Sequence, residues 1–223
     1  NVSCMERTDI NWCLKDWPRK MKSDFQLYIL KKYKQDSHGK GSELLIKQAA
    51  LAYGIPREAL VDEKVCRSSS GKPFFENMDI HFSISHTEDL WACLIGAANC
   101  GLDVQYIRPC NFTKIAGRFF SEREKAYVQK NGTEGFFEIW TRREAFGKYT
   151  GEGFFGTMPE FVSPDGLIEK QVLIKDNEFI SLKEIPGSHI AEGIKCAVCL
   201  PEGYEGQIEI TDLREVLKEG FEL

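Results

Sequence analysis

The stretch LWACLIGAANCGLDVQY, residues 90–106, contains two predicted strands joined by a short turn. Leu90 to Ala97 is almost entirely apolar, which is typical of a buried strand. The Asn99-Cys100-Gly101 turn leads into Leu102 to Tyr106, where apolar and polar residues alternate. Together with the alternating run Ile80 to Ser85, these segments predict an antiparallel meander.

Helical segments are predicted on both sides of this meander. The segment 119–130 has Ser121 in the N-cap position and Glu124 in the capping-box position. The order of helices followed by strands occurs twice along the chain. The spacing from Ser85-His86 to Cys93 recurs from Ser188-His189 to Cys196, which suggests two related halves. The predicted helices cover residues 24–34, 42–53, 119–130, 136–149 and 213–219.

Composition limits the classes of function. The chain has 223 residues, enough for one large domain or two small ones. Its formal net charge of -5 argues against general nucleic-acid binding. Residues 1–50 nevertheless carry ten Lys and Arg against six Asp and Glu. This basic region is either a local anion site or a solvated helix face.

The cysteines indicate a reducing compartment. Cys196-x-x-Cys199 lies in an apolar run, with no second such pair and no histidine at zinc-finger spacing, so we expect buried, reduced thiols. No apolar segment of the signal-peptide kind is visible. The longest apolar run, Trp91 to Ala98, is too short to span a bilayer. We therefore expect a cytoplasmic protein that binds no membrane.

The predicted helix around Glu144 is the most informative segment for chemistry. Glu144 and Lys148 are four residues apart and share one helix face. They could form an ordinary surface ion pair. Alternatively, a carboxylate among Arg142, Arg143 and Lys148 suits a metal and polyphosphate site, in which the cations hold phosphate oxygens. Asp103 could join Glu144 in holding Mg²⁺, which prefers oxygen ligands.

Other polar residues are weaker candidates. Lys72, in the loop SSSGKP, could contact a nucleotide beside the stiff Pro73, or could be an exposed turn lysine. Ser85 and His86 end a predicted strand, where they could also cap backbone groups. Gln105 shares a strand face with Asp103 but adds no charge. The sequence contains no G-x-S-x-G and no P-loop.

Four segments, in this order and spacing, resemble the Sfp-type (surfactin-synthetase-activating) 4'-phosphopantetheinyl transferases. The resemblance extends from about Tyr33 to Phe154. Each motif is short, and the order of all four together carries the resemblance. The motifs are Gly71-Lys72-Pro73, Phe82-Ser83-Ile84-Ser85-His86, Gly101-Leu102-Asp103-Val104 and Trp140-Thr141-Arg142-Arg143-Glu144-Ala145-Phe146-Gly147-Lys148, the last followed by Thr150-Gly151-Glu152-Gly153.

The resemblance implies an α/β (α+β) fold built from a pseudo-twofold pair of similar halves. Each half would be a small antiparallel sheet packed with helices, with the active site in the cleft between them. We place the halves at residues 1–106, on the coenzyme A side, and 107–223, with the Glu144 helix. The implied reaction transfers phosphopantetheine from coenzyme A to a carrier-protein serine and releases adenosine 3',5'-bisphosphate.

The resemblance also implies roles for individual residues. Asp103 and Glu144 would ligate Mg²⁺, with Gln105 beside them, directly or through water, where many members have Glu. Glu144 and Lys148 would be catalytic, as proton acceptor and pyrophosphate contact. Arg143 stands where Lys is usual, which changes the geometry of the charge. The coenzyme A contacts would be Lys72, Pro73, Ser85, His86 and Lys148, with His38 and Lys40 at the helix entry that serves the 3'-phosphate.

The expected partners are coenzyme A and an acyl, peptidyl or polyketide carrier protein, with no nucleic acid. A monomer is expected, because both sides of the cleft lie in one chain. Two alternatives remain. The chain could be a coenzyme A or nucleotide-binding module that lacks transfer activity, since one carboxylate is missing. It could also be a scaffold protein whose motif matches are accidental.

Overall fold

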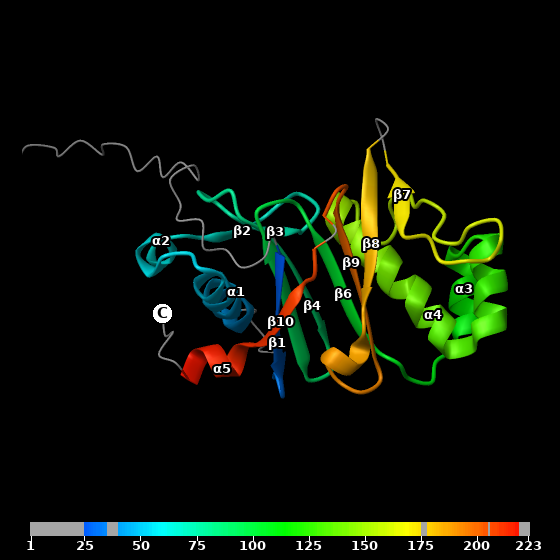
Figure 1. Cartoon of the computed structure of the whole chain (residues 1–223), viewed down its shortest axis with the longest axis horizontal. Helices are drawn as coiled ribbons and strands as arrows, with labels where there is room; N and C mark the ends of the chain where they lie inside the picture. The colour runs from blue at the N-terminus through cyan, green and yellow to red at the C-terminus, as the bar shows by residue number, and fades with distance from the viewer. Residues whose placement is uncertain (1–24, 35–39, 175–177, 205, 219–223) are drawn as a thin grey trace, which may run out of the picture.

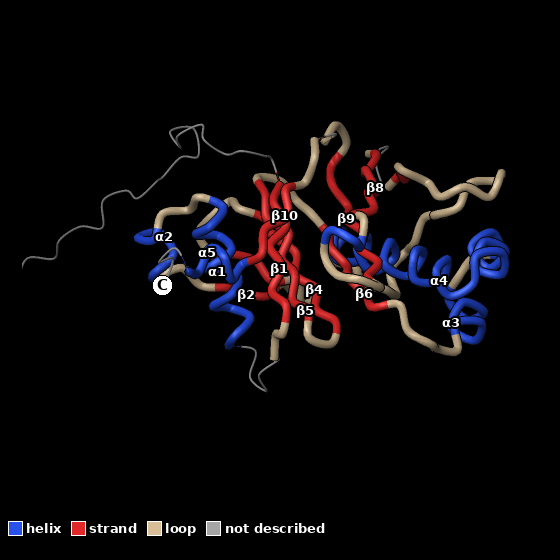
Figure 2. Tube along the Cα trace, turned by 60° about the horizontal axis from the view of Figure 1, so that its bottom comes forward, coloured by secondary structure: helices blue, strands red, loops and turns tan. Residues whose placement is uncertain are grey.

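Two four-stranded sheets lie face to face, with helices on their outer sides, in the computed structural model of the chain (Figures 1 and 2). The structure describes residues 25–34, 40–174, 178–204 and 206–218. The strand orders are β10-β1-β5-β4 in the first sheet and β6-β9-β8-β7 in the second. Among the helices in the described ranges, none is both long enough and apolar enough to cross a bilayer.

In the first sheet, β5 pairs antiparallel with β1 and with β4, and β10 pairs parallel with β1. Helices α1, α2 and α5 lie on its outer side (Figure 1). The elements are β1 (Phe25–Lys31), β4 (His81–Thr87), β5 (Leu90–Gly96), β10 (Glu209–Asp212), α1 (Lys40–Tyr53), α2 (Arg57–Val61) and α5 (Leu213–Lys218).

The second sheet is antiparallel throughout, and α4 packs against β6 and β9. A separate hairpin, β2 (Val65–Arg67) and β3 (Pro73–Phe75), carries the Lys72 loop. The other elements are β6 (Gly101–Tyr106), β7 (Gln171–Leu173), β8 (Phe179–Ile185), β9 (Ile194–Pro201), α3 (Phe112–Phe119), α4 (Glu122–Thr150) and the short 3-10 helix η3 (Gly187–His189).

The two sheets share one internal order. Each sheet contains three neighbouring strands that lie in the order first, third, second along the chain. These are β1-β5-β4 in the first sheet and β6-β9-β8 in the second. This order agrees with the expected pair of similar α/β halves. Cys93 and Cys196 lie in the equivalent strands β5 and β9, but His86 and His189 lie in different kinds of element, β4 and η3. The repeated Ser-His to Cys spacing in the sequence therefore corresponds to equivalent positions of the fold only at the cysteines.

The division of the chain at residue 106 does not coincide with the division between sheets. Strand β6 precedes this boundary but belongs to the second sheet, and β10 and α5 follow it but pack with the first sheet. The halves 1–106 and 107–223 therefore stay a prediction.

The described residues form three hydrophobic cores, and side chains that point alternately to the two faces of a strand contribute to two of them. In β5, Leu90, Ala92 and Leu94 face the core between the sheets, and the residues between them face α1. This double burial explains why β5 is apolar throughout. In β6, Leu102 and Val104 face the same inter-sheet core, which leaves Asp103 and Gln105 on the side of α4.

Two local predictions were wrong. The meander ends after β5, because β6 pairs with β9 rather than with β5. The predicted helix 24–34 is strand β1, in which Leu27 and Ile29 face one core and Tyr28 faces the other. A short apolar run fits either periodicity, and pairing with β5 on one side and β10 on the other decides for the strand.

Other local predictions were confirmed. Helix 42–53 falls within α1, and helix 213–219 corresponds to α5. The predicted helices 119–130 and 136–149 form most of α4, which Gly132 interrupts, and Ser121 and Glu124 make the capping box. Cys196 and Cys199 are buried and free, whereas Cys4 and Cys13 lie outside the described residues.

Candidate active site

Close packing of α4 on β6 creates the site. Gly101 opens β6, and a Cβ atom there would lie 2.0 Å from the carbonyl oxygen of Ala145. Only glycine allows this approach without a shift of the helix or the strand. Because Asp103 lies two residues along β6 on the same side, the approach brings its carboxylate to Glu144 and Lys148.

Asp103 is buried, and three neighbours hold its carboxylate. Lys148 Nζ lies 2.8 Å from Oδ1 and forms an ion pair with it. Ser85 Oγ donates to the same oxygen at 2.9 Å. The Gln105 side-chain amide donates to Oδ2 at 3.4 Å. The predicted neighbourhood of Asp103, Gln105 and Lys148 therefore exists, and Lys148 pairs with Asp103 rather than with Glu144.

Glu144 lies one turn before Lys148 on α4 and is half-buried. Among the described residues it makes no hydrogen bond and no ion pair. Burial raises the pKa of Glu144, the Asp103 carboxylate raises it further, and Lys148 lowers it. A carboxylate that makes no hydrogen bond or ion pair with a described residue, beside a second carboxylate, suits binding of a cation or acceptance of a proton.

The two arginines next to Glu144 point elsewhere, which corrects the predicted ring of cations. Arg142 contacts Glu138 at 3.5 Å and Glu184 at 3.3 Å. Arg143 pairs with the fully buried Glu124 at 3.0 Å. Each helical residue is rotated by about 100° from the one before, so neither arginine shares the face of Glu144. Of the three predicted cations, only Lys148 reaches the site.

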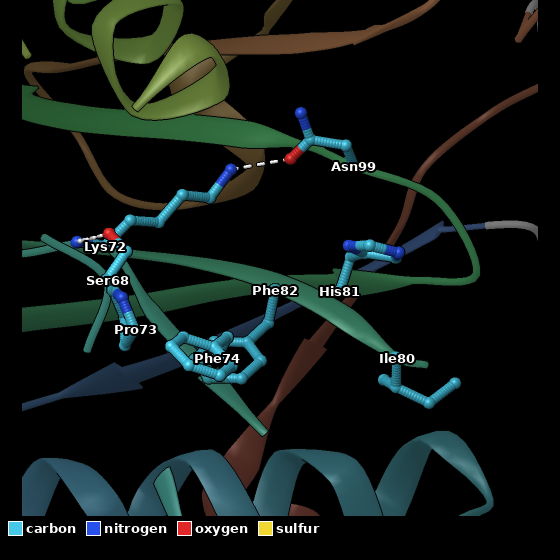
Figure 3. Close-up of a pocket in the computed structure, with 8 residues that line it drawn as sticks. All are labelled: Ser68, Lys72, Pro73, Phe74, Ile80, His81, Phe82 and Asn99. Carbon is cyan, nitrogen blue, oxygen red and sulfur yellow. Dashed lines mark hydrogen bonds between the residues drawn. The ribbon is translucent and has the colours of Figure 1, made fainter. Parts of the chain in front are cut away.

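Lys72 connects the β2–β3 hairpin to the second half of the molecule. Its Nζ donates to Asn99 Oδ1 at 2.6 Å and to the carbonyl oxygens of Cys100 and Tyr149 at 3.2 and 3.3 Å. Figure 3 shows the side chain reaching across to Asn99. Burial lowers the pKa of Lys72. Its ammonium group thus satisfies carbonyls at the end of α4 and the start of β6.

Two hollows lie against the Lys72-Pro73 segment. One, of about 240 Å³, is bordered by Phe74, Phe82 and Asn99 among others (Figure 3). The other, of about 230 Å³, runs between the hairpin, β4 and the end of α4, where Lys148 lies. Several of its lining residues received no individual role from the sequence. Ser70, Ser83, Ile84, Gly147, Gly151 and Gly153 lie in the quoted loop and motifs, whereas Arg67 lies outside them.

The remaining predicted contacts are dispersed. Ser85 is buried beside Asp103, whereas His86 is exposed on the opposite face of β4. Lys40 is the first residue of α1, and His38 lies outside the described residues. In the described part of the chain, no group of three or more His, Cys, Asp or Glu side chains forms a metal site.

Comparison with known proteins decides the family. The family model of the 4'-phosphopantetheinyl transferase superfamily matches residues 99–199, which include β6, α4 and most of β9. The 4'-phosphopantetheinyl transferase gsp of Aneurinibacillus migulanus is 31% identical over 179 residues, which cover 77% of this chain and 72% of that protein. The chain belongs to the 4'-phosphopantetheinyl transferase family.

Two further relatives of this transferase come from Bacillus subtilis. One 4'-phosphopantetheinyl transferase is 29% identical over 203 residues, covering 83% of this chain and 84% of that protein. The 4'-phosphopantetheinyl transferase Sfp of strain 168 is 27% identical over 184 residues, covering 75% of each chain. The Sfp-type resemblance found in the sequence motifs is therefore confirmed over most of the transferase.

Proposed function

We propose that this transferase moves 4'-phosphopantetheine from coenzyme A to a serine hydroxyl of a carrier protein, in a reaction that requires Mg²⁺. One observation carries the proposal. Asp103, Glu144 and Lys148 meet where α4 packs on β6, and Lys148 also lines the hollow beside the Lys72-Pro73 segment. A ligand in that hollow would therefore lie next to two carboxylates and an ammonium group.

The residues present fit a magnesium ion. Asp103 and Glu144 supply carboxylate oxygens, which are the ligands that Mg²⁺ prefers, and Gln105 supplies an amide. Burial raises the pKa of Glu144, and the Asp103 carboxylate raises it further. A divalent cation would relieve this repulsion between the two carboxylates. When bound, Mg²⁺ would neutralise charge on the diphosphate of coenzyme A.

The side chains of the chain itself then have distinct tasks. Lys148 would leave Asp103 for the diphosphate oxygens and neutralise the charge that develops there. Glu144 would accept the proton of the carrier serine, directly or through a water, and its raised pKa suits a general base. The serine oxygen forms a bond to the β-phosphorus, the bond to the bridging oxygen breaks, and adenosine 3',5'-bisphosphate leaves with that oxygen.

Mass spectrometry tests the proposal. Acyl, peptidyl and polyketide carrier domains are each incubated with coenzyme A, Mg²⁺ and the protein, with a serine-to-alanine carrier as control. At least one intact carrier should gain the mass of phosphopantetheine, and the control should not. Coenzyme A binding without mass gain on any carrier would favour the binding module, and the absence of binding would favour the scaffold.

We also propose that the protein works as a monomer in the cytoplasm. Asp103 and Lys148 come from one chain, as do all residues of the hollow, so no second subunit is needed to complete the site. Light scattering at working concentration should give the mass of a single chain, 25.4 kDa. A dimer whose dissociation abolishes transfer would contradict this part of the proposal.

Gln105 offers a test of the metal site. We expect Gln105→Glu to lower the half-saturating Mg²⁺ concentration by roughly three- to tenfold, because it adds a carboxylate beside Asp103. The Mg²⁺ dependence of the transfer rate measures the effect. Gln171→Glu, on an exposed position of β7, adds the same charge far from the site and should leave the dependence unchanged. An unchanged value for Gln105→Glu would show that residue 105 does not face the metal.

Lys148 should show two effects of opposite direction. Lys148→Met removes the ammonium that occupies Asp103, so the protein without coenzyme A should bind Mn²⁺ roughly three- to tenfold more tightly. The same variant should need at least tenfold more coenzyme A for half-maximal transfer. Metal titration and steady-state kinetics measure the two effects, with Lys130→Met, at an exposed position of α4, as control. Weaker metal binding by Lys148→Met would refute the competition.

A further inference from the structure

Strands β4 and β6 lie side by side at the junction of the two sheets without a shared backbone ladder. Hydroxyl groups at alternate positions of β4 take the place of carbonyl acceptors. Ser83 Oγ accepts from Leu102 N–H at 3.0 Å, and Ser85 Oγ accepts from Val104 N–H at 3.2 Å. A third hydroxyl, of Thr87, accepts from the next alternate N–H of β6 at 3.5 Å. These hydroxyls satisfy an otherwise unpaired strand edge.

Ser85 differs from the other two hydroxyls. Its side chain is buried, and its Oγ donates to Asp103 Oδ1 at 2.9 Å. A hydroxyl has one proton, so the Val104 N–H that occupies an acceptor site directs this proton toward Asp103. Ser83 makes no such contact with a carboxylate among the described residues. The Thr87 hydroxyl donates to the side-chain amide oxygen of Gln105, at 3.5 Å, and not to a carboxylate.

The resemblance to the family assigned Ser85 to phosphate binding, whereas its surroundings favour a different role. Only 4% of Ser85 is exposed, and its hydroxyl has a partner both as donor and as acceptor. It also joins the two halves, because Ser85 lies on the first sheet and Asp103 on the second.

We propose that Ser85 is a positioning residue that orients the Asp103 carboxylate for the metal ion. The inference rests on the proposed function, since it takes Asp103 as a metal ligand. A hydrogen bond to Oδ1 restricts the rotation of the carboxylate, with Oδ1 held beside Lys148 and Oδ2 toward Gln105. The packing of β4 against β6 thus sets the geometry of the metal ligand.

Three variants test this role, with Mn²⁺ as the probe. Ser85→Ala should weaken Mn²⁺ binding, measured by electron paramagnetic resonance, by about tenfold or more. Ser83→Ala removes the neighbouring bond to the strand edge without touching Asp103. Ser83→Ala should lower the thermal midpoint of unfolding about as much as Ser85→Ala does. It should leave the Mn²⁺ affinity within twofold of that of the native chain. Ser85→Thr keeps the hydroxyl and should restore most of the affinity.

The outcomes separate this inference from the proposed function. Folded Ser85→Ala protein that binds Mn²⁺ as tightly as the native chain would overturn the positioning role. Equal losses of affinity in Ser83→Ala and Ser85→Ala would also overturn it, because they would point to general loosening of the strand edge. Absence of Mn²⁺ binding by the native chain would do the same. Failure of the native chain to modify any carrier, with metal binding intact, would instead refute the proposed function.

Discussion

Replacement of Glu144 by glutamine is expected to lower the rate of phosphopantetheine transfer by a factor of about 10²–10⁴. The amide has nearly the same shape but can neither accept the serine proton nor neutralise a metal ion. Glu144 makes no hydrogen bond or ion pair with another described residue, so the fold should remain intact. Single-turnover transfer to a carrier protein, followed by mass spectrometry, measures the loss.

The control for this prediction lies on the same helix. Glu122→Gln removes a carboxylate from the exposed first turn of α4 and should transfer at the native rate. The free energy of unfolding of Glu144→Gln should lie within about 1 kcal/mol of that of the native chain. Turnover by Glu144→Gln within tenfold of the native value would show that another group accepts the proton.

Loss of the Arg143 guanidinium is expected to cost about 3–5 kcal/mol of stability. Arg143 pairs with Glu124, which is fully buried, and also lies over the rings of Phe120 and Phe154. Arg143→Met keeps much of the apolar stem but leaves Glu124 buried without its cation. Urea denaturation at neutral pH measures the change in free energy of unfolding. A change below about 1 kcal/mol would contradict the structural role of this pair.

The stability loss in Arg143→Met should depend on pH, because the substitution leaves the buried Glu124 carboxylate unpaired. Burial raises the pKa of Glu124 in the native chain, while Arg143 and the Ser121 N–H lower it. Without Arg143 the pKa in the folded state rises further above that of the unfolded chain. As the pH falls, Glu124 therefore binds a proton in the folded variant at a higher pH than in the unfolded variant. The loss in free energy of unfolding relative to the native chain should shrink as the pH falls from 7 toward 5.

A double variant isolates the buried charge. Arg143→Met combined with Glu124→Gln removes both charges and keeps an amide that can accept from the Ser121 N–H. It should be more stable at neutral pH than Arg143→Met alone. If the double variant is less stable than the single one, the loss comes from packing against the aromatic rings and not from the unpaired carboxylate.

Strands β4, β5 and β6 and helices α1, α4 and α5 could be predicted from periodicity and capping signals. The capping box of Ser121 and Glu124 is a local arrangement, so the residues themselves specify it. Strand β1 was predicted as a helix because its apolar residues fit both periods, and partners far along the chain decided between them. The same limit explains β6, whose partner β9 lies about ninety residues away.

The site was predictable as a set of residues but not as a set of contacts. The motifs indicated Asp103, Glu144 and Lys148, and the structure brings them together. They also suggested that Arg142 and Arg143 face Glu144, whereas both arginines pair with buried or half-buried glutamates elsewhere. Arg142 pairs with Glu184 on β8, and Arg143 pairs with Glu124, nineteen residues earlier on α4. Only the contact of Arg142 with Glu138, four residues before it, follows a local helical spacing.

The sequence by itself determined the family, the alternation that places Asp103 opposite Leu102 and Val104, and the helix face shared by Glu144 and Lys148. These features follow from residue order and from the periods of strands and helices. Only the tertiary structure decided that Lys148 pairs with Asp103, that Lys72 is bound to carbonyls, and that Ser85 holds a carboxylate. The reason is physical: each of these contacts joins elements far apart in the chain, and the packing of the two sheets against each other sets their distances.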